Sequence, residues 1–275
     1  MKKLLCFDLD DTLLATDKSI SEENKQAIRR AADEGNYVSI VSGRSKRGSS
    51  FVAEELGMIG RKNCFLIAFQ GNLIWDYEND RCVYMDGIPL DDGIRLLNEI
   101  SDAGFYTQTY TADEMLIPGI CEEFEHYNSI VHEKHRIIPS WDELTEPTLP
   151  KIMAIDYHDY ERLKRFREHF LTLNYADRFD CFFSSTDYLE FCKRDSNKGH
   201  GVKKLAEYLQ VDVKNVVTIG DERNDISMLT YAGVGVAMNN AHHSVKKYAD
   251  YITSNDNDHS GVAEVIRKFI LNEEQ

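Results

Sequence analysis

Short apolar runs alternate with amphipathic segments along the first 70 residues or so, and this alternation is the strongest constraint on the fold. Leu4 to Leu9 is a continuous apolar run, and the stretches YVSIVSGR and CFLIAFQGN contain two more. Such runs are typical of strands that are buried on both faces of a parallel sheet. Between the first two runs, residues 21–32 predict a helix with Ser21 as N-cap, and a second helix is expected to end near Gly57. We therefore expect a βαβαβ unit, the beginning of a doubly wound sheet.

This alternation stops near residue 73 and resumes at Lys198. LIWDY and RCVYM predict a hairpin, and helical patterns at residues 91–103 and 160–171 then alternate with strand-like segments. From Lys198 onward, an amphipathic helix, the apolar run NVVTIGD and a further helix follow, and GVAEVIRKFIL predicts a closing helix. We predict an α/β fold in which residues 1–84 and 191–275 form a Rossmann-like, doubly wound parallel sheet and residues 85–190 form an inserted α+β domain.

Composition excludes several classes of protein. The chain has 275 residues, enough for a sizeable core, and a net charge of −15, which argues against a nucleic-acid partner because phosphates would be repelled. No apolar run approaches the roughly 18 residues of a membrane span. The 6 cysteines lack the spacing of a metal site or a disulfide framework. We therefore expect a cytoplasmic protein with reduced thiols that binds neither nucleic acid nor membrane, and the sequence indicates no particular oligomeric state.

Polar residues collect at the predicted carboxyl ends of the core strands, where open α/β sheets place their functional groups. They are Asp8, Asp10 and Thr12 after the first strand, Ser42, Gly43 and Arg44 after the second, Asn72 after the third, and Asp221, Asn224 and Asp225 after NVVTI, with Lys198 opening the preceding helix. Several carboxylates at one edge repel one another unless a cation lies among them. Because the ligands are oxygens without a nearby His or Cys, they favour a hard cation, Mg²⁺ first.

A cation beside a lysine and a Ser-Gly turn suits a phosphate. The backbone N–H groups of the turn and the Ser42 hydroxyl can hold phosphate oxygens, and Lys198 supplies a positive charge. In phosphoryl transfer a carboxylate can act as the nucleophile through an aspartyl-phosphate. An aspartate is already ionised at neutral pH, so it needs no base to activate it.

These residues carry a resemblance to a known family. DLDDT at Asp8, SGR at Ser42, Lys198 in SNKGHGV and GDERND at Gly220 resemble, in order and spacing, the four motifs of the haloacid dehalogenase superfamily phosphatases. The large insertion between the second and third motifs and the final SNDNDHSGVAEVI segment are similar to the Cof-like subgroup, in which the insertion is a cap domain. The sequence departs from the family pattern at three places. Asp11 stands where glycine is commoner, KRDSNKG leads into the third motif, and QGN follows the third strand.

The resemblance implies a Mg²⁺-dependent phosphatase that hydrolyses a small phosphomonoester, a sugar phosphate or a phosphorylated cofactor, through an aspartyl-phosphate. It implies that Asp8 is the nucleophile and a metal ligand, that Asp10 protonates the leaving oxygen and activates water while its carbonyl binds the metal, and that Asp221 is a further metal ligand. The remaining roles that it implies are phosphate binding by Ser42, Gly43, Lys198 and Asn224, and support of the site by Thr12, Arg44 and Asp225.

Two other functions stay open. A phosphosugar mutase of the same superfamily would pass the phosphoryl group to another hydroxyl, and a non-enzymatic phosphorylatable signalling module also combines an acidic cluster with a lysine on a doubly wound sheet. Arg44 is expected either to clamp phosphate or to form a salt bridge. The aromatic residues of DCFFSSTDYLEF are expected in the core, while Asp187 and Glu190 remain candidates to face a substrate.

Overall fold

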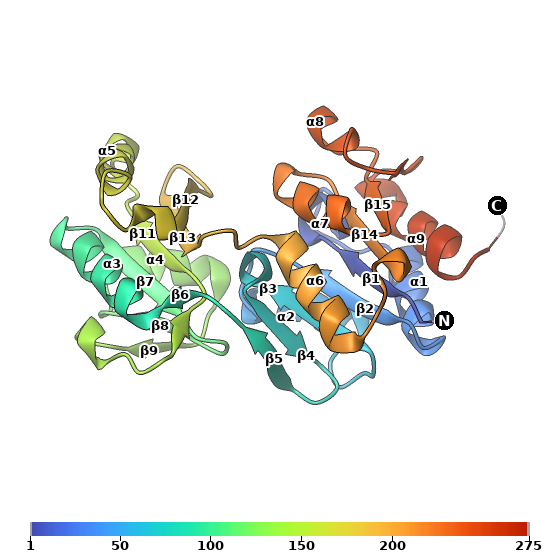
Figure 1. Cartoon of the computed structure of the whole chain (residues 1–275), viewed down its shortest axis with the longest axis horizontal. Coiled ribbons are helices and arrows are strands. Elements are labelled where there is room, and N and C mark those ends of the chain that lie inside the picture. Colours follow the sequence, from blue (N-terminus) through green and yellow to red (C-terminus); the bar gives the residue numbers. More distant parts are fainter. Residues whose placement is uncertain (1, 274–275) are drawn as a thin grey trace. The chain divides into compact units, whose positions relative to one another are not determined.

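The computed structural model describes residues 2–273. The chain divides into two compact units (Figure 1). The first, here called the core unit, contains residues 2–45, 49–84 and 197–273. The second, the inserted unit, contains Lys46–Gly48 and Met85–Ser196. Among the described residues no helix has the length and apolar character of a membrane span.

The core unit contains an eight-stranded, mostly parallel sheet. Its strands, in the order in which they lie side by side, are β16 (Tyr251–Ile252), β15 (Val234–Ala237), β14 (Val216–Gly220), β1 (Leu4–Phe7), β2 (Tyr37–Val41), β3 (Cys64–Ala68), β4 (Leu73–Asp76) and β5 (Arg81–Met85). The strands from β16 to β3 pair in parallel, whereas β4 pairs with β3 in antiparallel orientation. The predicted α/β class and its parallel sheet are confirmed, and the predicted hairpin of β4 and β5 extends that sheet.

Helices alternate with the strands of this sheet along the chain, and the last helix follows β16. They are α1 (Glu22–Asp33), α2 (Ser50–Leu56), α6 (Lys198–Leu209), α7 (Ile226–Tyr231), α8 (His243–Lys246) and α9 (Gly261–Val265). The hydroxyl of Ser21 accepts the N–H of Asn24 and caps α1, as the sequence predicts. Gly57 ends α2 in the left-handed conformation with φ 70°, which glycine adopts without a Cβ clash.

Short helical turns complete the connections along the chain. The π-helical turns are η1 (Leu9–Leu13) and η9 (Ile266–Ile270). The 3₁₀ turns are η2 (Arg47–Ser49), η3 (Phe69–Gly71), η4 (Trp141–Glu143), η5 (Ala176–Arg178), η6 (Val213–Asn215), η7 (Arg223–Asp225) and η8 (Asn257–His259). Two of these turns, η1 and η7, come soon after the neighbouring strands β1 and β14, and the acidic residues described below lie between strand and turn or within η7.

The inserted unit is built on a six-stranded mixed sheet. In spatial order its strands are β12 (Phe179–Phe183), β13 (Tyr188–Lys193), β11 (Ile152–Ile155), β7 (Tyr106–Tyr110), β8 (Met115–Ile117) and β9 (His135–Ile137), and β6 (Ile88–Pro89) pairs separately with β10 (Thr148–Leu149). Its helices are α3 (Leu90–Asp102), α4 (Glu122–Val131) and α5 (Tyr160–Phe170). Among the described strands of this sheet, β8 pairs with β9 in parallel, whereas the other neighbouring strands pair in antiparallel orientation.

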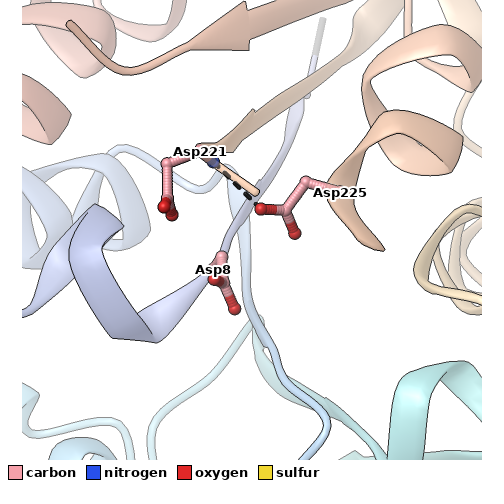
Figure 2. Close-up of side chains that lie close together, drawn as sticks. All are labelled: Asp8, Asp221 and Asp225. Carbon is pink, nitrogen blue, oxygen red and sulfur yellow. Dashed lines mark hydrogen bonds between the residues drawn. The ribbon is translucent and has the colours of Figure 1, made fainter. Parts of the chain in front are cut away.

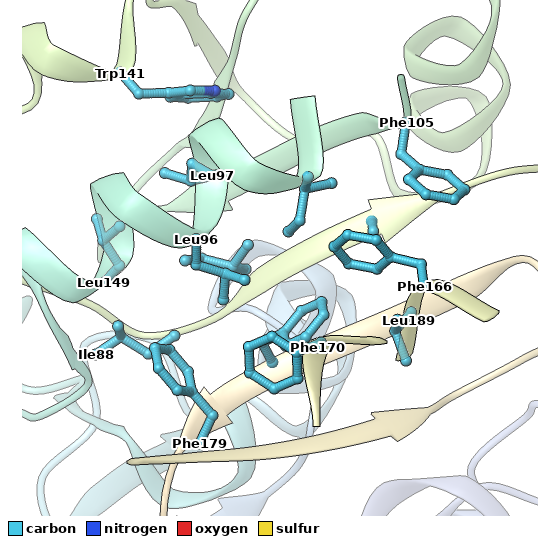
Figure 3. Close-up of a cluster of buried hydrophobic side chains, with 14 of the residues drawn as sticks. Ile88, Leu96, Leu97, Phe105, Trp141, Leu149, Phe166, Phe170, Phe179 and Leu189 are labelled. Atoms are coloured by element: carbon cyan, nitrogen blue, oxygen red, sulfur yellow. The ribbon is translucent and has the colours of Figure 1, made fainter. Parts of the chain in front are cut away.

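Apolar side chains of α3 and α5 pack against one face of this mixed sheet. Figure 3 shows Leu96 and Leu97 of α3 with Phe166 and Phe170 of α5 in this cluster. Phe191 of β13 is fully buried in it, and Phe183 packs against its edge. Of the aromatic residues in DCFFSSTDYLEF, Phe191 therefore has the expected core position and Phe183 is partly buried against the core, and the insertion has a hydrophobic core of its own.

Candidate active site

Acidic side chains meet at the carboxyl ends of β1 and β14. Because these two strands are parallel neighbours, Asp8 and Asp221, which directly follow them, lie at the same edge of the sheet. Asp225 lies in η7, one turn beyond Asp221. One carboxylate oxygen of each of these three residues lies within 4.8 Å of the others, and all three side chains are buried (Figure 2).

The loop after β1 is a tight turn with one unusual backbone conformation. The N–H of Leu14 donates to the carbonyl of Leu9 at 2.9 Å and closes the turn. Asp10 is extended, whereas Asp11 has φ 56°, in the left-handed region that residues other than glycine rarely adopt. The Thr12 hydroxyl donates to Oδ1 of Asp221 at 2.6 Å, which ties this loop to the loop after β14.

The loop after β14 is organised around the carboxylate of Asp225. Its Oδ2 accepts the N–H of Asp221 at 2.9 Å, drawn as a dashed line in Figure 2, and the N–H of Glu222 at 3.0 Å. The Glu222 side chain accepts the N–H of Arg223 and that of Asp225, and the second of these bonds completes a capping box. Backbone donors therefore fix the position of Asp225 inside the acidic group.

Lys198 forms ion pairs with two carboxylates of this acidic group. Its side chain is 1% exposed, and Nζ lies 2.7 Å from Oδ1 of Asp8 and 2.6 Å from Oδ1 of Asp225. Lys198 is the first residue of α6, and the side chain of Asn197 caps that helix by accepting the N–H of His200. A Cβ on Gly199 would lie 2.4 Å from the carbonyl oxygen of Ser227, so glycine lets α6 and α7 approach closely where the lysine is placed.

The buried charges of this group do not balance. Burial raises the pKa of Asp8 to about 7, an effect that Lys198 opposes and Asp225 reinforces. Burial likewise raises the pKa of Asp221 to about 7, against the hydrogen bond from Thr12. Burial alone would lower the pKa of Lys198, but the attraction of Asp8 and Asp225 outweighs burial and raises it. One ammonium thus faces three buried carboxylates.

These residues fit a divalent cation. A bound cation would offset the negative charge that Lys198 leaves uncompensated, and it would lower the pKa of Asp8 and Asp221. The group offers carboxylate oxygens and contains neither a His nor a Cys, which is the donor set of a hard cation such as Mg²⁺. Asp8, Asp221 and Asp225 are therefore the residues that would hold it.

Asp10 lies on the same loop, but its carboxylate is not part of this group. Its Oδ1 lies 2.8 Å from Nη2 of Arg44 and 3.3 Å from Nζ of Lys18, and its side chain is 43% exposed. Of the two alternatives for Arg44, the salt bridge is present, and its partner is Asp10. The side chain of Asp10 is thus directed to a more exposed place than that of Asp8.

The Ser-Gly turn follows β2, next to β1. Ser42 is buried, and its Oγ accepts the N–H of Arg44 at 3.1 Å. A Cβ on Gly43 would lie 2.6 Å from Nε2 of Gln70, so a larger residue at position 43 would have to displace the end of that side chain. Asn72 is buried after η3, whereas Asn224 has an exposed side chain in η7.

Sequence reasoning placed Asp225 at this edge of the sheet in a supporting role, and its carboxylate lies in the acidic group beside Lys198. One feature of the site was missed. Gln70 was not singled out, although it lies against Gly43 and has φ 57°. The only signal for Gln70 was the unusual QGN after the third strand.

Comparisons with known proteins point in one direction. A model of the haloacid dehalogenase-like hydrolase family matches residues 5–266. A 5-amino-6-(5-phospho-D-ribitylamino)uracil phosphatase of Bacillus subtilis is 32% identical over 98% of this chain and 96% of that protein. A pyridoxal phosphate phosphatase of Escherichia coli is 25% identical over 98% of this chain and 99% of that protein. The crystal structure of a haloacid dehalogenase-like hydrolase from Bacteroides thetaiotaomicron superposes with a TM-score of 0.84 and 28% identity, covering 98% of this chain and 99% of that one.

Proposed function

The chain belongs to the haloacid dehalogenase-like hydrolase family, and on this premise we propose that it hydrolyses small phosphomonoesters with Mg²⁺ and through an aspartyl-phosphate. The four motifs predict a resemblance to the phosphatases of this family and to its Cof-like subgroup, and this prediction is confirmed. The observation that carries the proposal is the buried group of Asp8, Asp221 and Asp225 around Lys198, because it joins a nucleophile, a cation site and a positive charge for phosphate.

In the proposed reaction a carboxylate oxygen of Asp8 attacks phosphorus, and the bond from phosphorus to the leaving oxygen breaks. Asp10 gives its proton to that oxygen and later removes a proton from water. The water oxygen then attacks phosphorus, the bond to Asp8 breaks, and inorganic phosphate leaves. Bound Mg²⁺ would supply charge neutralisation for the approach of the phosphate to Asp8. In this proposal the groups that would hold Mg²⁺ are the carboxylates of Asp8 and Asp221 and the backbone carbonyl of Asp10. Asp225 is the third carboxylate of the acidic group.

The other predicted residues would bind the phosphate. The ammonium of Lys198 lies beside Asp8 and can hold a phosphoryl oxygen without moving away from the nucleophile. Ser42, Gly43 and Asn224 would add a hydroxyl, a backbone N–H and an amide. Thr12 supports the site through Asp221, and Arg44 through Asp10.

The proposed substrate is a sugar phosphate or a phosphorylated cofactor. Relatives that act on a phosphorylated ribityl compound and on pyridoxal phosphate support this size and class. We propose the core unit as the catalytic domain, and the inserted unit as a cap domain that contacts the leaving group. Both of these relatives are phosphatases, which favours hydrolysis over the mutase reaction. A signalling module would have no use for an insertion of this length.

Phosphate release from a panel of metabolite phosphomonoesters, with and without Mg²⁺, tests the proposal. We expect release from at least one compound, and we expect chelation of divalent cations to lower the rate roughly 100-fold or more, since the uncompensated carboxylates would then repel the phosphate. Magnesium should also raise the melting temperature of the natural protein, and much less that of the Asp221→Asn variant. Equal rates in Mg²⁺ and in chelator would contradict the cation site, and no release from any compound would contradict the phosphatase.

A further inference from the structure

The turn between β15 and α8 contacts both loops that carry the acidic group. The N–H of Met238 donates to the carbonyl of Gly220 at 3.0 Å, and the N–H of His242 donates to the carbonyl of Asp221 at 3.1 Å. Between them, Nδ2 of Asn240 donates to the carbonyl of Asp11 at 2.7 Å. Residues 238–242 therefore bind the loop after β14 through their backbone and the loop after β1 through one side chain.

A second asparagine extends this contact. The N–H of Asn257 donates to Oδ1 of Asn240 at 3.2 Å, so the amide of Asn240 is held at both ends. Nδ2 of Asn257 donates to the carbonyl of Leu14 at 3.1 Å, at a buried position. The loop after β1 is thus bound at two places, at the Asp11 carbonyl by Asn240 and at the Leu14 carbonyl by Asn257.

The backbone of this loop needs such support. Asp11 has φ 56°, in the left-handed region that aspartate tolerates less well than glycine, so contacts that fix its peptide help to hold this conformation. Rotation of the peptide that carries the Asp11 carbonyl would displace Thr12, and with it the hydrogen bond to Asp221. It would also turn Asp10, the residue on the other side of Asp11. A rotation of the peptide at the Asp11 carbonyl would therefore disturb both neighbouring residues, Asp10 and Thr12.

We propose that Asn240 is a positioning residue for the reaction, which fixes the Asp11 carbonyl and thereby the directions of Asp10 and Thr12. This inference rests on the proposed function, because Asp10 and Thr12 matter only if phosphate chemistry takes place beside them. Asn240 acts through the loop and not on the substrate. Its loss therefore lowers the turnover number while the affinity for substrate is kept.

The test compares Asn240→Ala with Asn239→Ala. Asn239 is the adjacent residue, its side chain is also exposed, and its Nδ2 donates to the carbonyl of Ser254, away from the loop after β1. For Asn240→Ala we expect kcat to fall roughly 10- to 100-fold, the size of effect that a small misplacement of catalytic groups causes, with KM nearly unchanged. Asn240→Asp should behave in the same way, because it keeps the acceptor for Asn257 and loses the donor. An Asn240→Ala enzyme with the kcat of the Asn239→Ala enzyme overturns the proposal.

Hydrogen–deuterium exchange gives a readout that does not depend on activity. The amide of Leu14 closes the turn, and in Asn240→Ala we expect amides in the peptide covering residues 9–14 to exchange roughly tenfold faster than in Asn239→Ala. Equal exchange in the two variants overturns the role of Asn240. If the natural protein releases no phosphate from any substrate, the proposed function fails, and the exchange measurement alone decides whether Asn240 holds the loop.

Discussion

Phosphate release is expected to fall roughly 10⁴-fold or more when Asp8 is replaced by asparagine, the scale seen when a covalent nucleophile is removed. Asparagine keeps the shape of the side chain but lacks the negative oxygen that would attack phosphorus. The substitution also removes one charge from the buried group, so the protein should stay folded. Phosphate release measured at saturating Mg²⁺ and substrate, together with the melting temperature, separates lost chemistry from lost structure.

Asp11→Asn is the matched control for this variant. Asp11 is exposed and lies three residues away on the same loop, and asparagine is one of the few residues that tolerates its φ of 56°. We expect this variant to keep nearly all of the natural turnover. An Asp8→Asn enzyme that turns over substrate as fast as the Asp11→Asn enzyme would exclude Asp8 as nucleophile.

Replacement of Lys198 by methionine is expected to lower the free energy of unfolding by about 3–5 kcal/mol, the usual cost of removing one partner from a buried charge pair. The ammonium is 1% exposed and contacts both Asp8 and Asp225, which would be left without their common partner. Urea unfolding in excess chelator measures this loss. Trp75 in the core unit can report the transition if Trp141 of the inserted unit is first replaced by phenylalanine in every variant.

Two further variants make this measurement specific. Lys203→Met removes an exposed lysine from the same helix and should change the urea midpoint very little. Adding Asp225→Asn to Lys198→Met removes one of the two stranded carboxylates, so it should restore part of the lost stability. If Lys198→Met unfolds at the same urea concentration as Lys203→Met, the buried charge network does not stabilise the core unit.

The core strands could be predicted because burial on both faces leaves a simple pattern. All residues of β1, β3 and β14 are buried, so β1 and β3 read as unbroken apolar runs and β14 as an apolar run with one threonine, Thr218. Elements of the inserted unit with little burial were missed. Helix α4 buries only Phe124 and Tyr127 in the described structure, and all three residues of β9 are exposed, so neither leaves an apolar period in the sequence. The predicted closing helix is likewise interrupted, since α9 continues as the π-helical turn η9.

The sequence could predict the site residues whose positions follow from the ends of the core strands. Asp8 and Asp221 follow parallel neighbours, and that rule alone brings them together. The position of the Asp225 carboxylate depends on two backbone hydrogen bonds in η7, and the pairing of Asp10 with Arg44 depends on side-chain rotamers. Neither follows from sequence spacing. The catalytic and phosphate-binding roles of these residues stay predictions until the variants are measured.

The order of strands in the core sheet also bears on how the molecule is made. β1 lies between β2 and β14, so its partner on one side is translated only after the whole inserted unit. A nascent chain ending at residue 196 contains every residue of the inserted unit but lacks β14, Lys198, Asp221 and Asp225. Because domains generally fold as units during synthesis, the inserted unit can fold while one edge of β1 is still unpaired. The acidic group at the end of β1 is therefore among the last parts of the protein to assemble on the ribosome.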